Sequence, residues 1–115
     1  MNTKSITKFV NSVGDVCALS YKMYDGNLED YGKDLAMFLN QVDRSRDIVE
    51  QVIERFKDSY YLYLSVYENS GNEIYYTIIQ DNNKNIIMKV SDTYKEIFKG
   101  TPLEFLQFLE LNNKK

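Results

Sequence analysis

The chain has 115 residues, a length that supports one hydrophobic core, so we expect a single compact domain over residues 1–115. Apolar residues make up 43% and charged residues 27%, which is typical of a folded globular protein. The absence of histidine excludes Ser-His-Asp and Cys-His triads and histidine zinc sites, and the single cysteine excludes an internal disulfide. The net charge of −3 disfavours direct binding to nucleic acid or to an anionic membrane.

The chain contains no apolar run close to the roughly 18–20 residues that a membrane span needs. The segment around Gly14-Asp15-Val16-Cys17 is a poor cleavage box for a signal peptide. We therefore expect a cytoplasmic protein with no membrane partner.

The N-terminal segment gives two conflicting patterns. Ile6, Phe9, Val10 and Val13 recur at helical spacing and predict a helix to about residue 13. Apolar and polar residues alternate between residues 16 and 24, as they do in a strand, although helical spacing also reaches this segment. Both interpretations stay open for 16–24, with helix slightly favoured.

A long helical region follows a turn at residues 25–27. Asn27 is a suitable N-cap, with Asp30 three residues later. An apolar stripe then runs to residue 56 without a glycine or proline after residue 32. The segment 27–58 is predicted to be one long helix, or two helices broken near Asp43–Ser45.

Residues 59–91 change to the alternation that is typical of strands. We predict strands at 60–68, 73–80 and 85–91, because the connections at 69–72 and 81–84 are rich in turn residues. Ser91 or Asp92 then begins a short helix through Phe98, and Gly100 ends it. Thr101 caps a last helix that has Pro102 at its first position.

These elements predict an α+β fold. N-terminal helices pack on a three-stranded antiparallel meander, and C-terminal helices follow. Such a small sheet leaves edges and one face open unless another segment or a partner covers them.

One candidate binding surface is a line of carboxylates, which we call the acidic ridge. On one helix these residues would lie on one side, opposite the apolar stripe. Their spacing is similar to that of phosphates along a nucleic-acid strand, which would fit the DNA groove of a basic partner. The plainer interpretation is a solvated helix face, which the flanking arginines partly neutralise. The ridge consists of Asp43, Asp47, Glu50, Glu54 and Asp58.

A second candidate surface is aromatic. Tyrosine is rigid, large and amphipathic, so a tyrosine-rich strand face suits a protein interface. The predicted strands at 60–68 and 73–80 carry no lysine or arginine, which argues against a platform for nucleic-acid bases. Strand propensity alone is the simpler explanation. The candidate residues are Tyr61, Tyr63, Tyr67 and Tyr75.

Other chemistry finds little support in the sequence. Residues 81–85 superficially resemble the start of an EF-hand loop, but the central glycine and distal glutamate are missing, so they fit a hairpin turn better. Phosphate-binding glycine motifs are absent. We therefore expect no cofactor, no metal site and no catalytic residues.

The function that these features favour is a non-catalytic binding protein that blocks an enzyme, for example a nuclease or another nucleic-acid-binding enzyme. Size, acidity and layout make the chain similar in style to small proteins of phages and mobile elements. These include anti-CRISPR and other anti-defence inhibitors, uracil-DNA-glycosylase inhibitors and toxin-immunity proteins. The likeness transfers no residue roles. Two alternatives are a structural subunit that forms a homodimer or larger homo-oligomer, and a carboxylate-based metal or small-ligand binder.

Overall fold

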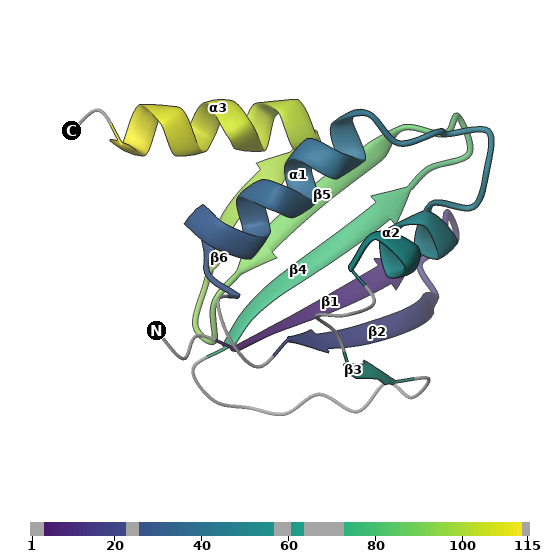
Figure 1. The fold of residues 1–115 in the computed structure, drawn as a ribbon, viewed down its shortest axis with the longest axis horizontal. Helices are drawn as coiled ribbons and strands as arrows, with labels where there is room; N and C mark the ends of the chain where they lie inside the picture. The colour runs from purple at the N-terminus through teal and green to yellow at the C-terminus, as the bar shows by residue number, and fades with distance from the viewer. Residues whose placement is uncertain (1–3, 23–25, 57–60, 64–72, 114–115) are drawn as a thin grey trace.

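The computed structural model describes residues 4–22, 26–56, 61–63 and 73–113 (Figure 1). Two strands come first, β1 (Lys4–Val10) and β2 (Val16–Lys22). A π-helical turn, η1 (Leu28–Gly32), runs into α1 (Lys33–Asn40), and α2 (Ile48–Phe56) follows. The remaining elements are β3 (Tyr61–Tyr63), β4 (Glu73–Gln80), β5 (Ile86–Ser91), β6 (Glu96–Gly100) and α3 (Pro102–Asn113).

The α+β class is confirmed, but the sheet differs from a three-stranded meander. Within the described residues it has six strands, in the order β3-β2-β1-β4-β5-β6. The central strands β1 and β4 run parallel, and every other neighbouring pair is antiparallel. The predicted pairing of the first two meander strands is wrong, because β2 and β1 separate β3 from β4. The antiparallel pairing of β4 with β5 is confirmed.

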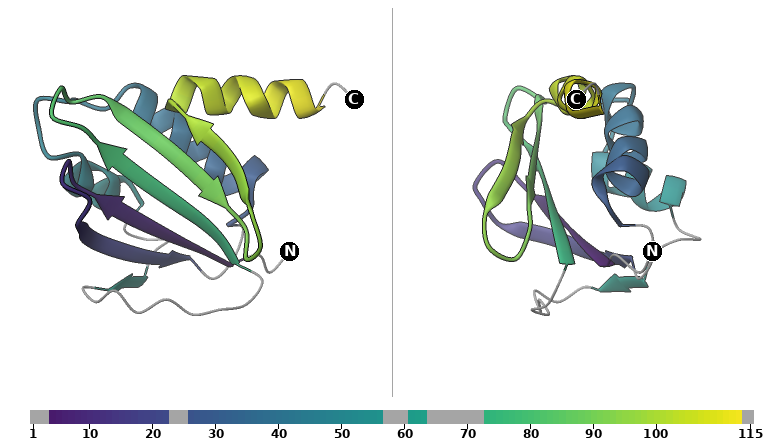
Figure 2. Two further views of the ribbon diagram at one scale, coloured as in Figure 1. Left: turned by 180° about the vertical axis from the view of Figure 1, so that it is seen from behind. Right: turned by 90° about the vertical axis from the view of Figure 1, so that its left-hand side faces the viewer.

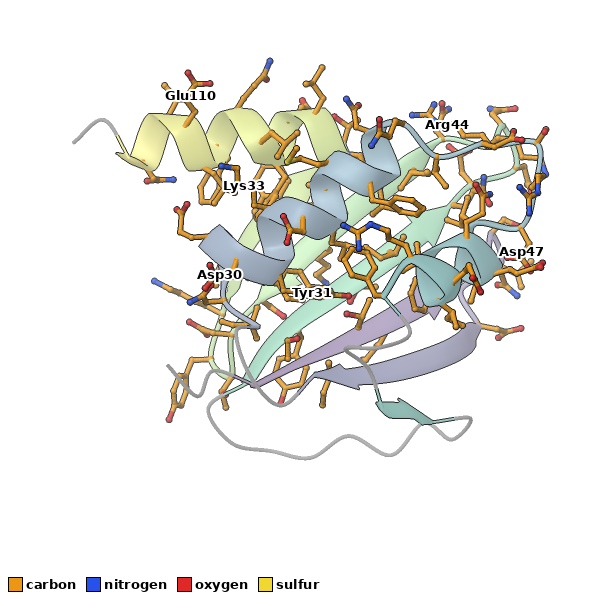
Figure 3. All side chains as sticks on the ribbon, in the orientation of Figure 1. Asp30, Tyr31, Lys33, Arg44, Asp47 and Glu110 are labelled. Carbon is orange, nitrogen blue, oxygen red and sulfur yellow. The ribbon has the colours of Figure 1, made fainter. Side chains whose placement is uncertain are left out.

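The helices form one layer on one face of this sheet (Figures 1 and 2). Tyr31 lies where the helical layer meets the sheet (Figure 3). Its ring packs edge-on against Tyr76 of β4, with centroids 5.2 Å apart, and against Phe56 of α2 at 5.5 Å. The hydroxyl of Tyr76 donates a hydrogen bond of 2.8 Å to the carbonyl of Gly26. These contacts attach the helices to the middle of the sheet.

The helix predicted through residue 13 is wrong, because residues 4–10 form strand β1. The slight preference for helix at 16–24 is wrong for 16–22, which form β2, and residues 23 and 24 lie outside the described residues. Phe9 joins the core beneath the helices, while Val13 stands 78% exposed in the turn between β1 and β2. The hydroxyls of the buried Thr7 and Tyr31 share a hydrogen bond of 2.9 Å. The helical spacing in this segment was therefore coincidental, and pairing with β4 decided the structure.

The described part of the region 27–58, which ends at residue 56, contains the separate helices α1 and α2 rather than one long helix. Asp43 accepts hydrogen bonds from the backbone N–H and the hydroxyl of Ser45, and Asp47 accepts one from the N–H of Val49. Such local side-chain bonds compete with helical hydrogen bonds and favour turns and helix caps. The predicted cap at Asn27 is confirmed, since its side chain accepts from the N–H of Asp30 at 2.9 Å.

The turns of the hairpins β1–β2, β4–β5 and β5–β6 are stabilised by the same kind of hydrogen bond. The residue that follows the first strand is Asn or Asp, and its side chain accepts hydrogen bonds from backbone N–H groups later in the turn. Asn11 accepts from residues 13 and 15, Asp81 from 83 and 85, and Asp92 from 94 and 95. The hairpin turn predicted at 81–84 is thus confirmed.

The short helix predicted from residue 91 or 92 to Phe98 is wrong, because the turn at Asp92 leads into strand β6 instead. The last helix is confirmed. The hydroxyl of Thr101 accepts from the N–H of Glu104, and the carboxylate of Glu104 accepts from the N–H of Thr101. Together they form a capping box in front of α3.

Candidate protein-binding surfaces

The acidic ridge does not form a single helical line. Asp43 lies in the loop between α1 and α2, Asp47 precedes α2, and Glu50 and Glu54 lie on α2. Asp58 lies outside the described residues. Figure 3 shows Arg44 and Asp47 at the end of the helical layer where this loop runs. The five-carboxylate ridge is therefore wrong for Asp43, and the remaining three span only the start and two turns of α2.

Positive charges also lie among these carboxylates. A hollow of about 540 Å³ beside α2 is lined by two arginines and two glutamates, with Phe38 and Gln51. The arginines are Arg46 and Arg55, and the guanidinium of Arg55 also lies 4.8 Å from the centre of the Phe56 ring. The opposing charges reduce the negative potential that the sequence predicted for this side of the molecule.

The carboxyl group of Asp43 serves its own loop. Hydrogen bonds from the hydroxyl and then the N–H of Ser45 lower its pKa, with a smaller contribution from the charge of Arg46. These bonds stabilise the ionised form in the turn. Asp43 thus stabilises the break between α1 and α2.

The tyrosines predicted to form a binding face lie on separated strands. Tyr61 and Tyr63 lie on the edge strand β3, Tyr75 lies on β4, and Tyr67 lies outside the described residues. The strand register still aligns two of them. Tyr61 pairs with Tyr21, Tyr21 with Ile6, and Ile6 with Tyr75, so Tyr61 and Tyr75 occupy one transverse row.

The side of the sheet that carries Tyr75 faces away from the described helices. Side chains alternate along β4, and Tyr76 and Ile78 belong to the core under the helices. Tyr75, Thr77 and Ile79 therefore lie on the opposite side, which the right-hand view of Figure 2 shows without a described helix. We call it the open face. The three side chains are half-buried, and Ile6, which pairs with Tyr75 on this face, is only 3% exposed, so this part of the face is not solvated.

An apolar row crosses four neighbouring strands of the open face. Val16 pairs with Val10, Val10 with Ile79, and Ile79 with Ile87. Val10, Ile79 and Ile87 are half-buried, and Val16 is 36% exposed. The sequence did not predict this row, because it depends on the parallel pairing of β1 with β4. We call these four residues the apolar row.

A lysine row lies beside the apolar row. Lys8 pairs with Thr77, Thr77 with Lys89, and Lys89 with Lys99. The ammonium of Lys89 lies 3.7 Å from a carboxylate oxygen of Glu96, and both side chains are about half-exposed. The name lysine row is used for Lys8, Lys89 and Lys99. Their alignment also escaped prediction, since the three residues come from strands at both ends of the chain.

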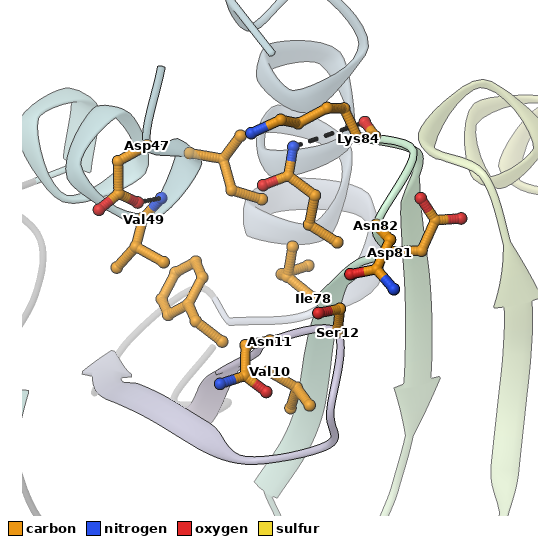
Figure 4. Close-up of a pocket in the computed structure, with 12 residues that line it drawn as sticks. Val10, Asn11, Ser12, Asp47, Val49, Ile78, Asp81, Asn82 and Lys84 are labelled. Carbon is orange, nitrogen blue, oxygen red and sulfur yellow. Dashed lines mark hydrogen bonds between the residues drawn. The ribbon is translucent and has the colours of Figure 1, made fainter. Parts of the chain in front are cut away.

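A small pocket opens at the carboxyl ends of the parallel strands β1 and β4, with a volume of about 300 Å³ (Figure 4). Its lining includes Asn11 and Asp81 from the two hairpin turns and Asp47 from the start of α2. These three side chains accept backbone N–H bonds of their own turns or helix. The rest of the lining combines further turn residues with apolar side chains of β1, β4 and α2, so the pocket has polar and apolar walls.

Within the described ranges, no cluster of three or more acidic or cysteine side chains is arranged to hold a metal ion. None of the described helices has the length and apolarity to cross a membrane. Comparison with known protein families, curated proteins and solved structures gives no match.

Proposed function

We propose that this chain is a non-catalytic binding protein of inhibitor or immunity type, which docks a protein partner on the open face of its sheet. The observation that supports this most strongly is the apolar row across β2, β1, β4 and β5. We place this role in the cytoplasm and in the style of phage or mobile-element proteins.

The composition of the open face argues for a partner. A sheet with one solvated face ordinarily carries polar residues on that face. Here three large β-branched side chains, Val10, Ile79 and Ile87, follow one another on adjacent strands, and Tyr75 stands on the same face. The apolar row lies at the strand ends, and the lysine row lies between it and Tyr75. Apolar, aromatic and charged side chains on one surface are common in protein interfaces.

The identity of the partner as a nucleic-acid-acting enzyme depended on the acidic ridge. The break at residues 41–47 and the arginines beside Glu50 and Glu54 weaken that argument. The proposal therefore commits to a protein partner and to the open face, and it assigns α2 no part in the contact.

Affinity capture with matched variants tests this proposal. The tagged full chain would be used to isolate partners from its source cell, and the captured protein would be purified and its binding measured directly. The test variant is Ile79→Thr with Ile87→Thr, which keeps β-branched side chains in the strands. The control is Leu103→Gln with Leu111→Gln on α3, where the two leucines are 49% and 69% exposed.

We expect the variant with threonine at positions 79 and 87 to bind the partner at least about tenfold more weakly than the parent chain. The control variant with glutamine at positions 103 and 111 should bind like the parent. Circular dichroism and thermal unfolding of each variant show whether the fold is kept. Equal binding by the parent and the folded threonine pair would rule out the open face as the docking surface. A chain that sediments as a stable dimer and captures no other protein would favour the homo-oligomer instead.

A further inference from the structure

We infer that the partner of the open face presents carboxylates, which lie against the lysine row of Lys8, Lys89 and Lys99. The inference rests on the proposed function, since it names the chemistry of the partner at that same face. It reverses the electrostatic prediction from the sequence, in which this chain supplied the carboxylates.

The register brings the three lysines onto one transverse line although they come from distant parts of the chain. The line runs from β1 through Thr77 of β4 to Lys89 of β5 and Lys99 of β6. Neighbouring strands lie about 4.8 Å apart, so the line extends over roughly 14 Å. That length suits a short acidic segment or helix face on a partner.

The arrangement is unfavourable for a chain that stays alone. Lys89 and Lys99 are direct cross-strand partners, and like charges in that relationship destabilise a sheet. Glu96 lies near Lys89, but an ion pair between half-exposed side chains contributes little. Carboxylates from a partner would remove this repulsion, so binding and sheet stability would change together.

Charge also separates between the two sides of the molecule. The chain is acidic overall, with a net charge of −3, yet the row contributes three positive charges to the open face. The helical segment 28–56 on the other side carries seven carboxylates and four basic side chains, so it stays acidic although its arginines reduce the negative potential. An acidic partner surface would therefore orient itself towards the sheet rather than the helices.

The neighbouring residues favour an acidic protein over nucleic acid. Phosphates beside Val10 and Ile79 would have to lose water against apolar side chains without compensation. The overall negative charge of the chain adds long-range repulsion of a nucleic-acid strand. An acidic protein segment that also carries apolar residues can pack against the apolar row and place its carboxylates beside the lysine row.

A probe experiment tests the inference without knowledge of the partner. The isotope-labelled full chain would be titrated with a short poly-L-glutamate peptide and, separately, with an oligothymidylate of matched charge, by amide chemical shift at low salt. We expect the peptide to shift amides of β1, β4, β5 and β6, and added salt to reverse the shifts. The oligothymidylate is expected to bind more weakly.

Two charge-reversed variants complete the design. Lys8→Glu with Lys89→Glu and Lys99→Glu should lose at least about tenfold in peptide affinity, whereas Lys33→Glu with Arg44→Glu and Arg46→Glu should lose little. Glutamine at the same lysine positions serves if charge reversal unfolds the sheet. Equal loss in both sets, unchanged binding in the first set, or tighter binding of the oligothymidylate would each overturn the inference.

The two proposals fail in distinguishable ways. The inference alone would be contradicted by a captured partner whose affinity falls when Ile79 and Ile87 are substituted, but does not change with the lysine substitutions or with salt concentration. The proposed function alone would be contradicted by a different pair of results. In that case the peptide binds at the lysine row, but no captured protein loses binding when the apolar row is substituted. The variant with glutamine at the three lysine positions could instead self-associate while its peptide affinity stays unchanged. That result would show that the lysines only prevent pairing at the edge of the sheet, and it would also overturn the inference.

Discussion

Val10 of β1 and Ile79 of β4 are register partners across the parallel centre of the sheet, on the face that carries no described helix. The pairing joins the hairpin of β1 and β2 to the antiparallel strands β4, β5 and β6. It also continues the apolar row to Val16 on one side and Ile87 on the other. One strand pairing thus builds both the fold and the surface that we propose to bind a partner.

A buried hydroxyl pair should stabilise the link between β1 and the helices. Thr7→Val removes the hydrogen bond between Thr7 and Tyr31 and leaves the tyrosine hydroxyl without that partner, at a cost of about 1–3 kcal/mol in the free energy of unfolding. Adding Tyr31→Phe should recover part of the loss. Urea denaturation of the single and double variants measures this, and a double variant less stable than the sum of the single variants would contradict the argument.

Gly32 should resist substitution although it lies at the start of a helix. A Cβ atom there would lie 2.8 Å from the hydroxyl oxygen of Tyr76 and 3.3 Å from a ring carbon of Phe105. Helix propensity alone makes Gly→Ala favourable by roughly 0.5–1 kcal/mol, whereas overpacking a core costs about 1–3 kcal/mol. We expect net destabilisation in a thermal melt. A more stable Gly32→Ala variant would show that Tyr76 moves aside readily.

The turn aspartates should make the hairpins sensitive to acid. The hydrogen bond from the N–H of Asn85 holds the pKa of Asp81 below the ordinary aspartate value of 3.8, and the N–H of Tyr94 does the same at Asp92. A carboxyl group with a lowered folded pKa adds stability above its unfolded pKa, and that stability is lost as pH falls through the folded value. The loss should therefore begin near pH 3.8 and continue below it.

Asp81→Asn is the test of this pH effect. Asn11 performs the same turn bonding in the first hairpin, so the amide should keep the turn while it removes the titration. Unfolding measured by circular dichroism should then depend less on pH below about 3.8 than in the parent. An unchanged acid profile would show that the Asp81 carboxylate adds no stability to the turn.

The capping box should be needed for α3. Thr101→Ala removes the acceptor of the Glu104 N–H and should lower stability by about 1 kcal/mol, in line with other N-cap losses. Thr101→Ser, which keeps the hydroxyl, is the matched control. If the two substitutions have equal effects on urea denaturation, the hydroxyl is not the stabilising group.

Local signals in the sequence were sufficient for some elements. The cap at Asn27, the Asp81 turn and the start of α3 at Pro102 follow from residues within a few positions of one another. The break between α1 and α2 lies at the position that the sequence offered as one of two alternatives, where Asp43 bonds to Ser45. Each depends on a short polar side chain that bonds to nearby backbone, which a single sequence displays directly.

The open face could not be predicted in this way. Ile6, Phe9 and Val10 fit a helix as well as a strand, and only the pairing with β4 decides between them. The apolar and lysine rows combine residues from distant strands, so neither row has a signature in any short window. The acidic ridge failed for the opposite reason, because a regular spacing was extended across a loop.

The most direct test of the account is an amide chemical-shift map of the isotope-labelled chain bound to its purified partner. We predict that the perturbed amides lie on β1, β4 and β5, around Val10, Ile79 and Ile87. Perturbation confined to α2 and the loop before it, around Asp47, Glu50 and Glu54, would contradict the open face as the docking surface and restore the acidic side of the molecule to that role.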